Sequence, residues 1–400
     1  MATAYGKALK SMEIEVAVPT PLEQTFTYTS EVEVSKGTRV LVPFGRRQVV
    51  GVAMGRRDED RKSAHAGEAY TLKPITKVID PSPVYSHNLM RLAHWMSDYY
   101  CHPLGEVLRT MLPAASSKIL KEKVQLTSRG LDLAKAQSDH PLNQVFGKRD
   151  NLTMATLKKK CAQLFPDLTK PWEKWQKDGW LTYDKQAVWS VRQTQARIRD
   201  SSQWGEAQNK PQLTAEQQAV VSKVVSAGLE GLDRRPFLLH GVTGSGKTEI
   251  YLHLIEEVLS RSQGGGQSLL LVPEISLTPQ MTRVFENRFP GDVAVVHSAM
   301  ADKDRWDRLE SVRRGDCHTL IGPRSAVFGP FRQLQLILVD EEHDSSYKQG
   351  SGLLYHGRDV ATVRAKLEEA TIVLGSATPS MESYFNAKVG KYHYLQLPHR

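Results

Sequence analysis

Residues 241–248 read GVTGSGKT and match the phosphate-binding loop pattern G-x-x-x-x-G-K-[ST]. A short apolar run of buried-strand type, residues 236–239, precedes this loop. Apolar residues recur at helical spacing in the segment 250–259 that follows it. Strand, glycine-rich turn and helix in this order predict a nucleoside triphosphate site. A plain glycine-rich turn is the alternative, but it does not account for the flanking strand and helix.

The residue types in this loop suit phosphate binding. Glycines let backbone N–H groups close around the phosphates, and the start of the following helix adds its positive dipole end. Lys247 is expected to reach the β- and γ-phosphates, and Thr248 to offer its hydroxyl to Mg²⁺. The residues predicted to bind the nucleotide here are Gly241, Thr243, Gly244, Ser245, Gly246, Lys247, Thr248 and Glu249.

A second apolar run, residues 334–339, is typical of a fully buried parallel strand and ends in Asp340-Glu341-Glu342-His343. Carboxylates at the carboxyl end of such a strand face the phosphate loop. We therefore predict that Asp340 holds the Mg²⁺ shell and that Glu341 polarises the attacking water, with Lys247, Asp340 and Glu341 as the catalytic set. A solvated acidic loop is the alternative, and the phosphate loop in the same chain argues against it.

Strand-like and helix-like segments alternate from about residue 205 to the end, which implies a parallel sheet with helices on both faces. The apolar strand candidates are 237–240, 268–272, 293–296, 318–321, 335–339 and 371–374. The predicted fold is therefore multidomain, and its third part, 205–400, is an α/β lobe with a parallel sheet. Loops at the carboxyl ends of its strands are expected to carry the chemistry.

The first part, 1–108, contains short β-rich segments between residues 13 and 78, which predict a small barrel or sandwich. Residues 56–69 are charged and rich in small residues, and predict a flexible hairpin loop. Apolar residues between 89 and 100 mark a closing helix.

The middle part, 114–199, has helical residues at 154–160 and a turn and strand at 178–183, an arrangement that suits a winged helix. Its three tryptophans, Trp172, Trp175 and Trp180, fit a core better than a stacking surface.

Composition agrees with this organisation. With 400 residues and 40% hydrophobic content, the chain can bury more than one core. No stretch approaches a membrane span and no signal peptide is evident, so we expect a soluble, cytoplasmic protein without a membrane partner. Its three cysteines have no metal spacing. The net charge is +9, and residues 101–200 hold 18 lysines and arginines against 10 acidic residues, which suits a polyanion partner.

The ordered motifs resemble the first RecA-like lobe of superfamily 2 helicases. They are the phosphate loop and the segments 272–280, 297–298, 321–326, 340–343 and 375–379. The stretches 241–249, 273–275 and 340–349 are similar, more narrowly, to bacterial primosomal replication-restart helicases. Residues 18–28 and 39–45 extend this resemblance to a domain that binds the 3′ end of a nascent DNA strand. The resemblance is good for 12–105 and 210–400 and weak between them.

The resemblance implies further site residues in the α/β lobe. Gln217 or Gln218 would read adenine, and Thr278 and Arg324 would touch the DNA backbone. Tyr347, Tyr355 and His356 would belong to an aromatic-rich loop that stacks on bases, although Leu353 stands where the family has tryptophan. The residues expected to couple the nucleotide to DNA are His343, Ser376 and Thr378.

In the first domain the resemblance implies a pocket for the terminal nucleotide, made by Phe26, Thr27, Gly45 and Lys73. The family has aspartate at the position of Thr27. Because threonine carries no charge, Thr27 can make only a neutral hydrogen bond there.

The resemblance further implies an ATP- and Mg²⁺-dependent 3′→5′ DNA helicase that recognises stalled forks in the bacterial nucleoid. Its expected partners are forked and single-stranded DNA, primosome and helicase-loading proteins, and single-stranded DNA-binding protein, and a monomer is expected. Zinc-binding cysteine pairs and a second lobe are expected downstream, so this chain should bind ATP and fork DNA with little turnover. Two alternatives stay open: a non-enzymatic fork-binding module with a vestigial nucleotide site, and another superfamily 2 translocase.

Overall fold

The computed structural model describes residues 11–57, 71–113, 123–137, 139–147, 149–184, 211–231, 233–262 and 265–399. The chain divides into two compact units, residues 1–115 together with 191–400, and residues 116–190. Most of the predicted 56–69 loop lies outside the described residues. The division into 1–108, 114–199 and 205–400 stays a prediction.

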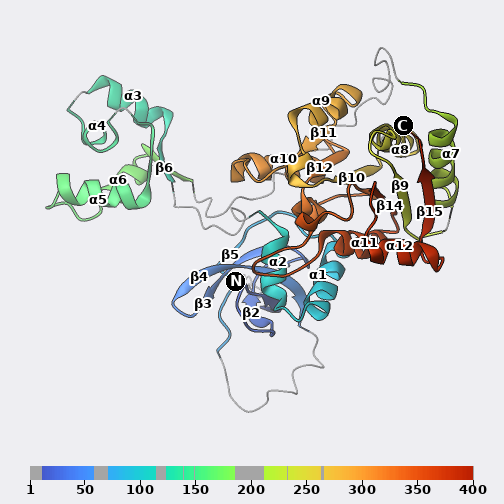
Figure 1. The fold of residues 1–400 in the computed structure, drawn as a ribbon. Helices are drawn as coiled ribbons and strands as arrows, with labels where there is room; N and C mark the ends of the chain where they lie inside the picture. Colours follow the sequence, from blue (N-terminus) through green and yellow to red (C-terminus); the bar gives the residue numbers. More distant parts are fainter. Residues whose placement is uncertain are drawn as a thin grey trace, which may run out of the picture. The chain divides into compact units, whose positions relative to one another are not determined.

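The amino-terminal part of the larger unit, coloured blue in Figure 1, is a five-stranded antiparallel sheet. Its strand order is β2-β1-β4-β3-β5. Its strands are β1 (Met12–Ala17), β2 (Phe26–Ser30), β3 (Arg39–Phe44), β4 (Arg47–Arg56) and β5 (Lys77–Val78). The backbone just before β5 also pairs with β2, where Thr29 N donates to Lys73 O and Ile75 N donates to Thr29 O. The sheet thus closes on itself, as the barrel prediction expects. Helices α1 (His87–Tyr99) and α2 (Leu104–Met111) follow.

The second part of this unit is a seven-stranded parallel sheet in the order β11-β12-β10-β13-β14-β9-β15. The strands are β9 (Phe237–Gly241), β10 (Gln267–Leu271), β11 (Val293–Val295), β12 (Thr319–Gly322), β13 (Leu334–Val339), β14 (Thr371–Ser376) and β15 (His393–Leu397). All six strands predicted from the sequence are present, and β15 is an additional one. The α/β lobe with a parallel sheet is therefore confirmed.

The helices of this lobe cover both faces of the sheet. They are α7 (Ala215–Val224), α8 (Lys247–Arg261), α9 (Pro279–Arg288), α10 (Asp302–Arg314), α11 (Gly357–Glu368) and α12 (Met381–Lys388). Helices α7, α8 and α9 share one apolar cluster with alternate residues of β9, β10 and β13. Helix α11 lies against β13 and β14 outside that cluster. Because both faces are covered, the central strands are almost continuously apolar.

The smaller unit contains a three-stranded antiparallel sheet, β7-β6-β8. Its elements are β6 (Lys123–Leu126), α3 (Ser128–Ala136), α4 (Pro141–Phe146), β7 (Asn151–Thr153), α5 (Met154–Leu164), α6 (Pro171–Lys177) and β8 (Leu181–Asp184). Gly179 has φ 74° in the turn before β8, a conformation that glycine adopts without strain. Trp175 is buried and Trp172 and Trp180 pack against the same core, so the core interpretation of the tryptophans is confirmed.

Among the described residues, no helix is both long and apolar enough to span a bilayer.

Candidate nucleotide and DNA site

The phosphate loop joins the carboxyl end of β9 to the first residue of α8. Gly244 and Gly246 have φ of 84° and 81°, a region in which other residues are strained. The Ser245 hydroxyl is buried and has no hydrogen-bond partner among the described residues. A buried polar group is normally paired, so this orphaned hydroxyl fits a ligand that brings hydrogen-bond acceptors. The loop therefore suits the phosphates of a nucleotide.

Lys247 lies under this loop with only 9% of its surface exposed. Its Nζ donates to the carbonyl oxygen of Gly241 at 3.1 Å and lies 3.5 Å from Oε1 of Glu341. The phosphate loop and the acidic motif are therefore in direct contact. An arriving phosphate would compete with Glu341 for the same ammonium group, and Glu341 would then be free to act on water.

Asp340 follows β13 and is held by two buried tyrosines. Tyr251 donates its hydroxyl to Oδ1 at 2.9 Å, and Tyr347 donates its hydroxyl to the Asp340 carbonyl at 2.8 Å. A Cβ at Gly375 would lie 1.8 Å from the Tyr251 hydroxyl, so only glycine fits beside this contact. Burial, and next the charge of Glu341, raise the pKa of Asp340 above its ordinary value.

The oxygen ligands that the chain offers at Asp340 suit Mg²⁺. This ion is commonly held by one or two carboxylates together with waters and substrate phosphates. Asp340 would supply the carboxylate, and the hydroxyl of Thr248, at the end of the phosphate loop, is the second ligand that the sequence predicts. A resident Mg²⁺ would neutralise charge on the phosphates, and it would offset the cost of the buried carboxylate.

Replacing Asp340 with asparagine is expected to leave nucleotide affinity measurable while removing its dependence on Mg²⁺.

The raised pKa of Asp340 gives this substitution a second effect, on stability. Stability linked to the protonated Asp340 is present at low pH and is lost as pH rises through the folded-state pKa. The variant should therefore melt at or above the wild-type temperature at neutral pH, with the difference shrinking in acid. Calorimetry with ADP, with and without Mg²⁺, and melting curves against pH check this. An Mg²⁺ dependence equal to wild type would contradict it.

Glu341 has φ 43°, in a region that non-glycine residues seldom adopt. Such backbone strain often accompanies functional sites, where the surrounding structure fixes one geometry. Its carboxylate lies between Lys247 and His343, whose Nδ1 is 3.7 Å from Oε2. Glu341 is therefore the one acidic side chain of this motif in contact with both the phosphate loop and the following histidine.

His343, Ser376 and Thr378 form one hydrogen-bonded cluster. His343 Nδ1 lies 2.8 Å from the Ser376 hydroxyl and Nε2 lies 3.3 Å from the Thr378 hydroxyl. The Thr378 backbone N–H also donates to Ser376 Oγ at 2.9 Å. The segments at the carboxyl ends of β13 and β14 are thus joined next to the acidic motif. The three residues that join them are those that the resemblance predicts to couple the nucleotide to DNA.

Glu342 is a site residue that the sequence analysis missed. Its side chain is completely buried and accepts from Arg358 Nη1 at 3.0 Å and from Ser380 N at 2.6 Å. It also accepts from the hydroxyls of Ser380 and Ser383, at 3.0 and 2.9 Å. One carboxylate therefore ties the acidic motif to the starts of α11 and α12. The only sequence signal was a third acidic residue in the cluster.

The structure separates the two glutamines proposed to read adenine. Gln217 forms a capping box with Thr214 at the start of α7, and its Nε2 donates to the Ser245 carbonyl at 2.9 Å. Gln218 instead lies 3.4 Å from the Ser222 hydroxyl on its own helix. Gln217 is therefore the one of the pair that touches the phosphate loop. Glu249 points to α9, with Oε1 3.4 Å from Arg288 Nη2.

Arg324 lies beside a small hollow at the carboxyl edge of the sheet. The residues that line the hollow include Arg305, Arg324, Ser298 and Ser346. Arg324 Nη1 is held by the carbonyl oxygens of Ser346 and Lys348 at 2.7 and 2.6 Å. Thr278 is exposed and caps the start of α9. It follows Glu274, which lines the same hollow, by four residues. Two arginines against the single carboxylate of Glu274 leave a net positive lining, which suits an anionic oxygen ligand.

The stacking predicted for Tyr347 and Tyr355 is not supported by their positions. Both side chains are buried, with 1% and 2% of their surface exposed, and burial raises the pKa of Tyr355 to about 12. Tyr355 lies under Arg324, whose Cζ is 5.7 Å from the ring centre. Leu353 is buried as well. These side chains form the core of the loop, because a loop of this length needs its own apolar contacts to hold one shape.

The predicted 3′-end residues are only partly brought together. The Phe26 ring packs edge to face against Phe44, with centroids 5.0 Å apart, and Gly45 follows Phe44 with φ 61° and open space around its α-carbon. Thr27 lies next to Phe26 in β2. Lys73 is exposed, and its backbone pairs with Thr29, farther along the same strand.

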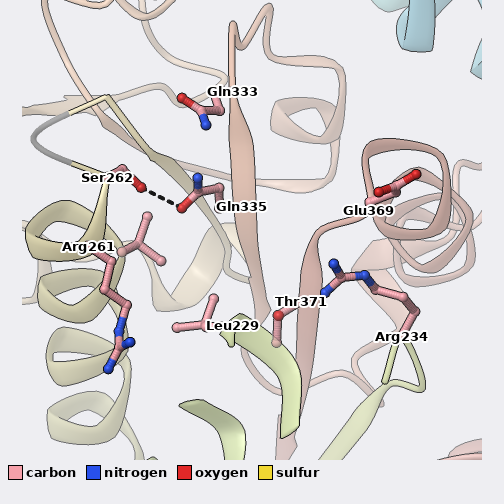
Figure 2. Close-up of a pocket in the computed structure, with 9 residues that line it drawn as sticks. Leu229, Arg234, Arg261, Ser262, Gln333, Gln335, Glu369 and Thr371 are labelled. Atoms are coloured by element: carbon pink, nitrogen blue, oxygen red, sulfur yellow. Dashed lines mark hydrogen bonds between the residues drawn. The ribbon is translucent and has the colours of Figure 1, made fainter. Parts of the chain in front are cut away.

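A separate polar pocket lies at the opposite edge of the parallel sheet. Figure 2 shows Gln333 and Gln335 at the start of β13, with Thr371 at the start of β14. Ser262 donates its hydroxyl to Gln335 Oε1 at 2.7 Å across this pocket (Figure 2). None of the site residues predicted from the sequence lines it. The residues predicted to bind the nucleotide follow the carboxyl ends of β9 and β13 instead.

Comparison with known families agrees with this arrangement. Residues 214–386 match the family model of DEAD/DEAH box helicases, and residues 15–113 match that of a 3′ DNA-binding domain, that of PriA. The fold and the site define a RecA-like helicase lobe that follows a DNA 3′-end-binding domain. The chain belongs to the family of the replication restart protein PriA.

Two relatives illustrate the similarity. The replication restart protein PriA of Chlamydia pneumoniae is 36% identical over 92% of this chain and 48% of that protein. The protein of the same name from Haemophilus influenzae is 34% identical over 98% of this chain and 52% of its own length. This chain thus spans about half the length of these curated relatives. A solved structure of RecG bound to a three-way DNA junction is 22% identical to this chain, over 48% of this chain and 24% of that one, with a TM-score of 0.34.

Proposed function

We propose that this chain supplies the 3′-end recognition and the ATP-binding lobe of a 3′→5′ DNA helicase that restarts replication at stalled forks. The observation that carries the proposal is the contact between the phosphate loop and the acidic motif, through Lys247 and Glu341 at 3.5 Å, in a chain that also has a 3′-end-binding domain. A nucleotide lobe alone would fit many translocases. A 3′-end domain in the same chain favours fork recognition over the other superfamily 2 motors.

In this proposal Lys247, Thr248 and Asp340 bind ATP and Mg²⁺, and Glu341 orients the water. Arg305 and Arg324 take a DNA phosphate in the hollow beside the site, and such contacts fix position without reading sequence. The smaller unit is a winged-helix-like DNA-binding module. Primosome proteins, helicase-loading proteins and single-stranded DNA-binding protein are the proposed partners of the monomer in the bacterial cytoplasm, at the nucleoid.

Binding of forked DNA tests this proposal. The chain should prefer a fork whose leading-strand 3′ end is a free hydroxyl over the same fork with a 3′-phosphate, and both affinities should fall steeply with salt. Fluorescence anisotropy at two salt concentrations measures this. Equal affinity for the two forks would remove the support for 3′-end recognition.

Phe26→Ala is expected to weaken binding of the free-end fork by about 1–3 kcal/mol, the usual contribution of one aromatic–base stack. Because Phe26 is half-buried against Phe44, some thermal stability should be lost too. Val32→Ala, at an exposed position just after β2, is the matched control and should bind like wild type. A Phe26 variant that keeps the full preference for the free end would exclude this residue from the pocket.

A further inference from the structure

Helix α11 of the helicase lobe is held at both ends by α1 of the 3′-end-binding domain. At its start, the backbone N–H of His356 donates to the Tyr100 hydroxyl at 3.3 Å. At its end, Asn88 Nδ2 donates to Glu368 Oε2 at 2.8 Å. Asn88 and Tyr100 lie at opposite ends of α1, so the two helices are fastened at two points almost a helix length apart. A change in the position or direction of α1 must therefore move α11 or break one of these bonds.

The start of α11 is connected to the nucleotide site. Arg358 pairs with Glu342 at 3.0 Å, two residues after Asp340 in the acidic motif. The loop just before α11 provides a second connection, since Gln349 N donates to the Tyr355 carbonyl and Tyr347 donates to the Asp340 carbonyl, both at 2.8 Å. Buried bonds of this kind are costly to break, because they leave a charged or polar group unpaired.

The end of α11 is connected to the turn that carries Arg324. Glu368 lies 3.4 Å from Arg364 Nη2, and Arg364 is buried with 1% of its surface exposed. Its guanidinium donates to the carbonyl oxygens of Val327 and Gly329. Residues Arg324–Phe328 form that turn. Glu368, which accepts from Asn88, is therefore connected through Arg364 to the segment beside the hollow. One helix thus contacts the 3′-end domain, the acidic motif and the Arg324 turn.

We propose that Tyr100 and Asn88 are positioning residues that couple occupancy of the 3′-end-binding domain to nucleotide affinity through α11. The proposal rests on the proposed function, since it requires both ligands to bind. Neither residue is among those predicted to bind the nucleotide or the DNA end. A DNA end that binds better to one arrangement of α1 favours the matching arrangement of α11, and thereby changes the geometry around Asp340 and Arg324. By linkage, the nucleotide must change affinity for the 3′ end by the same factor.

The test measures that factor with ADP·Mg²⁺ and two single-stranded oligonucleotides that differ only in a 3′-hydroxyl or 3′-phosphate. Calorimetry gives the ADP affinity of the chain alone and with each oligonucleotide at saturation. In wild type, the free 3′ end should change the ADP affinity by about fivefold or more relative to the 3′-phosphate oligonucleotide, the lower limit of typical allosteric coupling. The reciprocal measurement, oligonucleotide affinity with and without ADP, should give the same factor.

Tyr100→Phe removes one hydroxyl, and the double variant with Asn88→Ala removes both attachments. We expect the factor to fall in the first and to approach 1 in the second, while each ligand alone binds within about twofold of wild type. Tyr99→Phe, which changes the same atom on the exposed neighbouring side chain, should keep the wild-type factor. Melting curves show whether a variant remains folded.

The possible failures are distinguishable. If ADP does not bind, or if the two oligonucleotides bind equally well, the proposed function is wrong. If both ligands bind as proposed but the factor is 1 in wild type, or is unchanged in the double variant, only the coupling through α11 is overturned.

Discussion

Lys247→Ala is expected to lower the affinity for ADP·Mg²⁺ by about 10- to 100-fold, since a hydrogen bond to a charged group is worth about 1.5–3 kcal/mol. The lysine is nearly enclosed, and its ammonium group lies between the Gly241 carbonyl and the Glu341 carboxylate. A charge held in that position is little screened by water, so its loss should be felt in full. Calorimetry with purified chain measures the change.

Folding should be affected much less than binding. Glu341 is about a third exposed, so water can solvate its carboxylate once Lys247 is gone. Lys391→Ala, at an exposed position of the same lobe, is the matched control and should bind ADP like wild type. If Lys247→Ala binds ADP as tightly as this control, the loop is not a phosphate site.

The parallel sheet could be predicted from the sequence because its central strands are buried on both faces and appear as apolar runs. Strand β15 gave no such signal. It lies at the edge of the sheet and, among the described strands, pairs with β9 alone. Its sequence is His-Tyr-Leu-Gln-Leu, in which exposed residues alternate with half-buried ones and the last leucine is buried. Its place depends on an unpaired edge of β9, which is a property of the assembled sheet. Similarly, the barrel prediction required only alternating short strands, and these were visible.

Two local motifs were enough to propose a nucleotide site, the loop Gly241–Thr248 and the strand-end pair Asp340 and Glu341. The structure brings these motifs into contact through Lys247 and Glu341. For the other predicted site residues, the outcome depended on whether the side chain is buried in the folded lobe. Tyr347 and Tyr355 are aromatic residues in a motif that the resemblance assigns to DNA binding, yet they fill the interior of their loop. Only tertiary packing distinguishes a core tyrosine from a stacking one. In the same way, the sequence alone could not choose between Gln217 and Gln218, which differ in the face of α7 they occupy.

Glu342 shows the same limit most clearly. Its partners Arg358, Ser380 and Ser383 stand 16, 38 and 41 residues away in the chain, so no local pattern connects them. In the folded lobe they come together around one carboxylate, because β13 and β14 are neighbours and their following segments meet at the carboxyl edge. The acidic cluster therefore contains one carboxylate whose hydrogen-bond partners in the structure belong to the protein itself.

Glu342→Ala is expected to cost about 3–5 kcal/mol of unfolding free energy, the usual result when one partner of a buried ion pair is removed. Arg358 would keep a buried charge paired with Asp359 alone, and the N–H and hydroxyl donors of Ser380 and Ser383 would lose their acceptor. Urea denaturation followed by tryptophan fluorescence and circular dichroism measures the loss. Glu382→Ala, at an exposed acidic position in the first turn of α12, is the matched control and should change stability by less than about 0.5 kcal/mol.

Glu342→Gln distinguishes the charge from the hydrogen bonds. The amide keeps one acceptor oxygen and the side-chain volume, but it brings an NH₂ group that faces other donors, and it leaves Asp359 as the carboxylate that pairs with Arg358. We therefore expect a stability between those of wild type and Glu342→Ala. In the double variant with Ser383→Ala, the serine substitution should cost less than it does alone, because its bond to Glu342 is already weakened. Additive losses, or a Glu342→Ala chain as stable as the Glu382 control, would show that this carboxylate does not hold the acidic motif to α11 and α12.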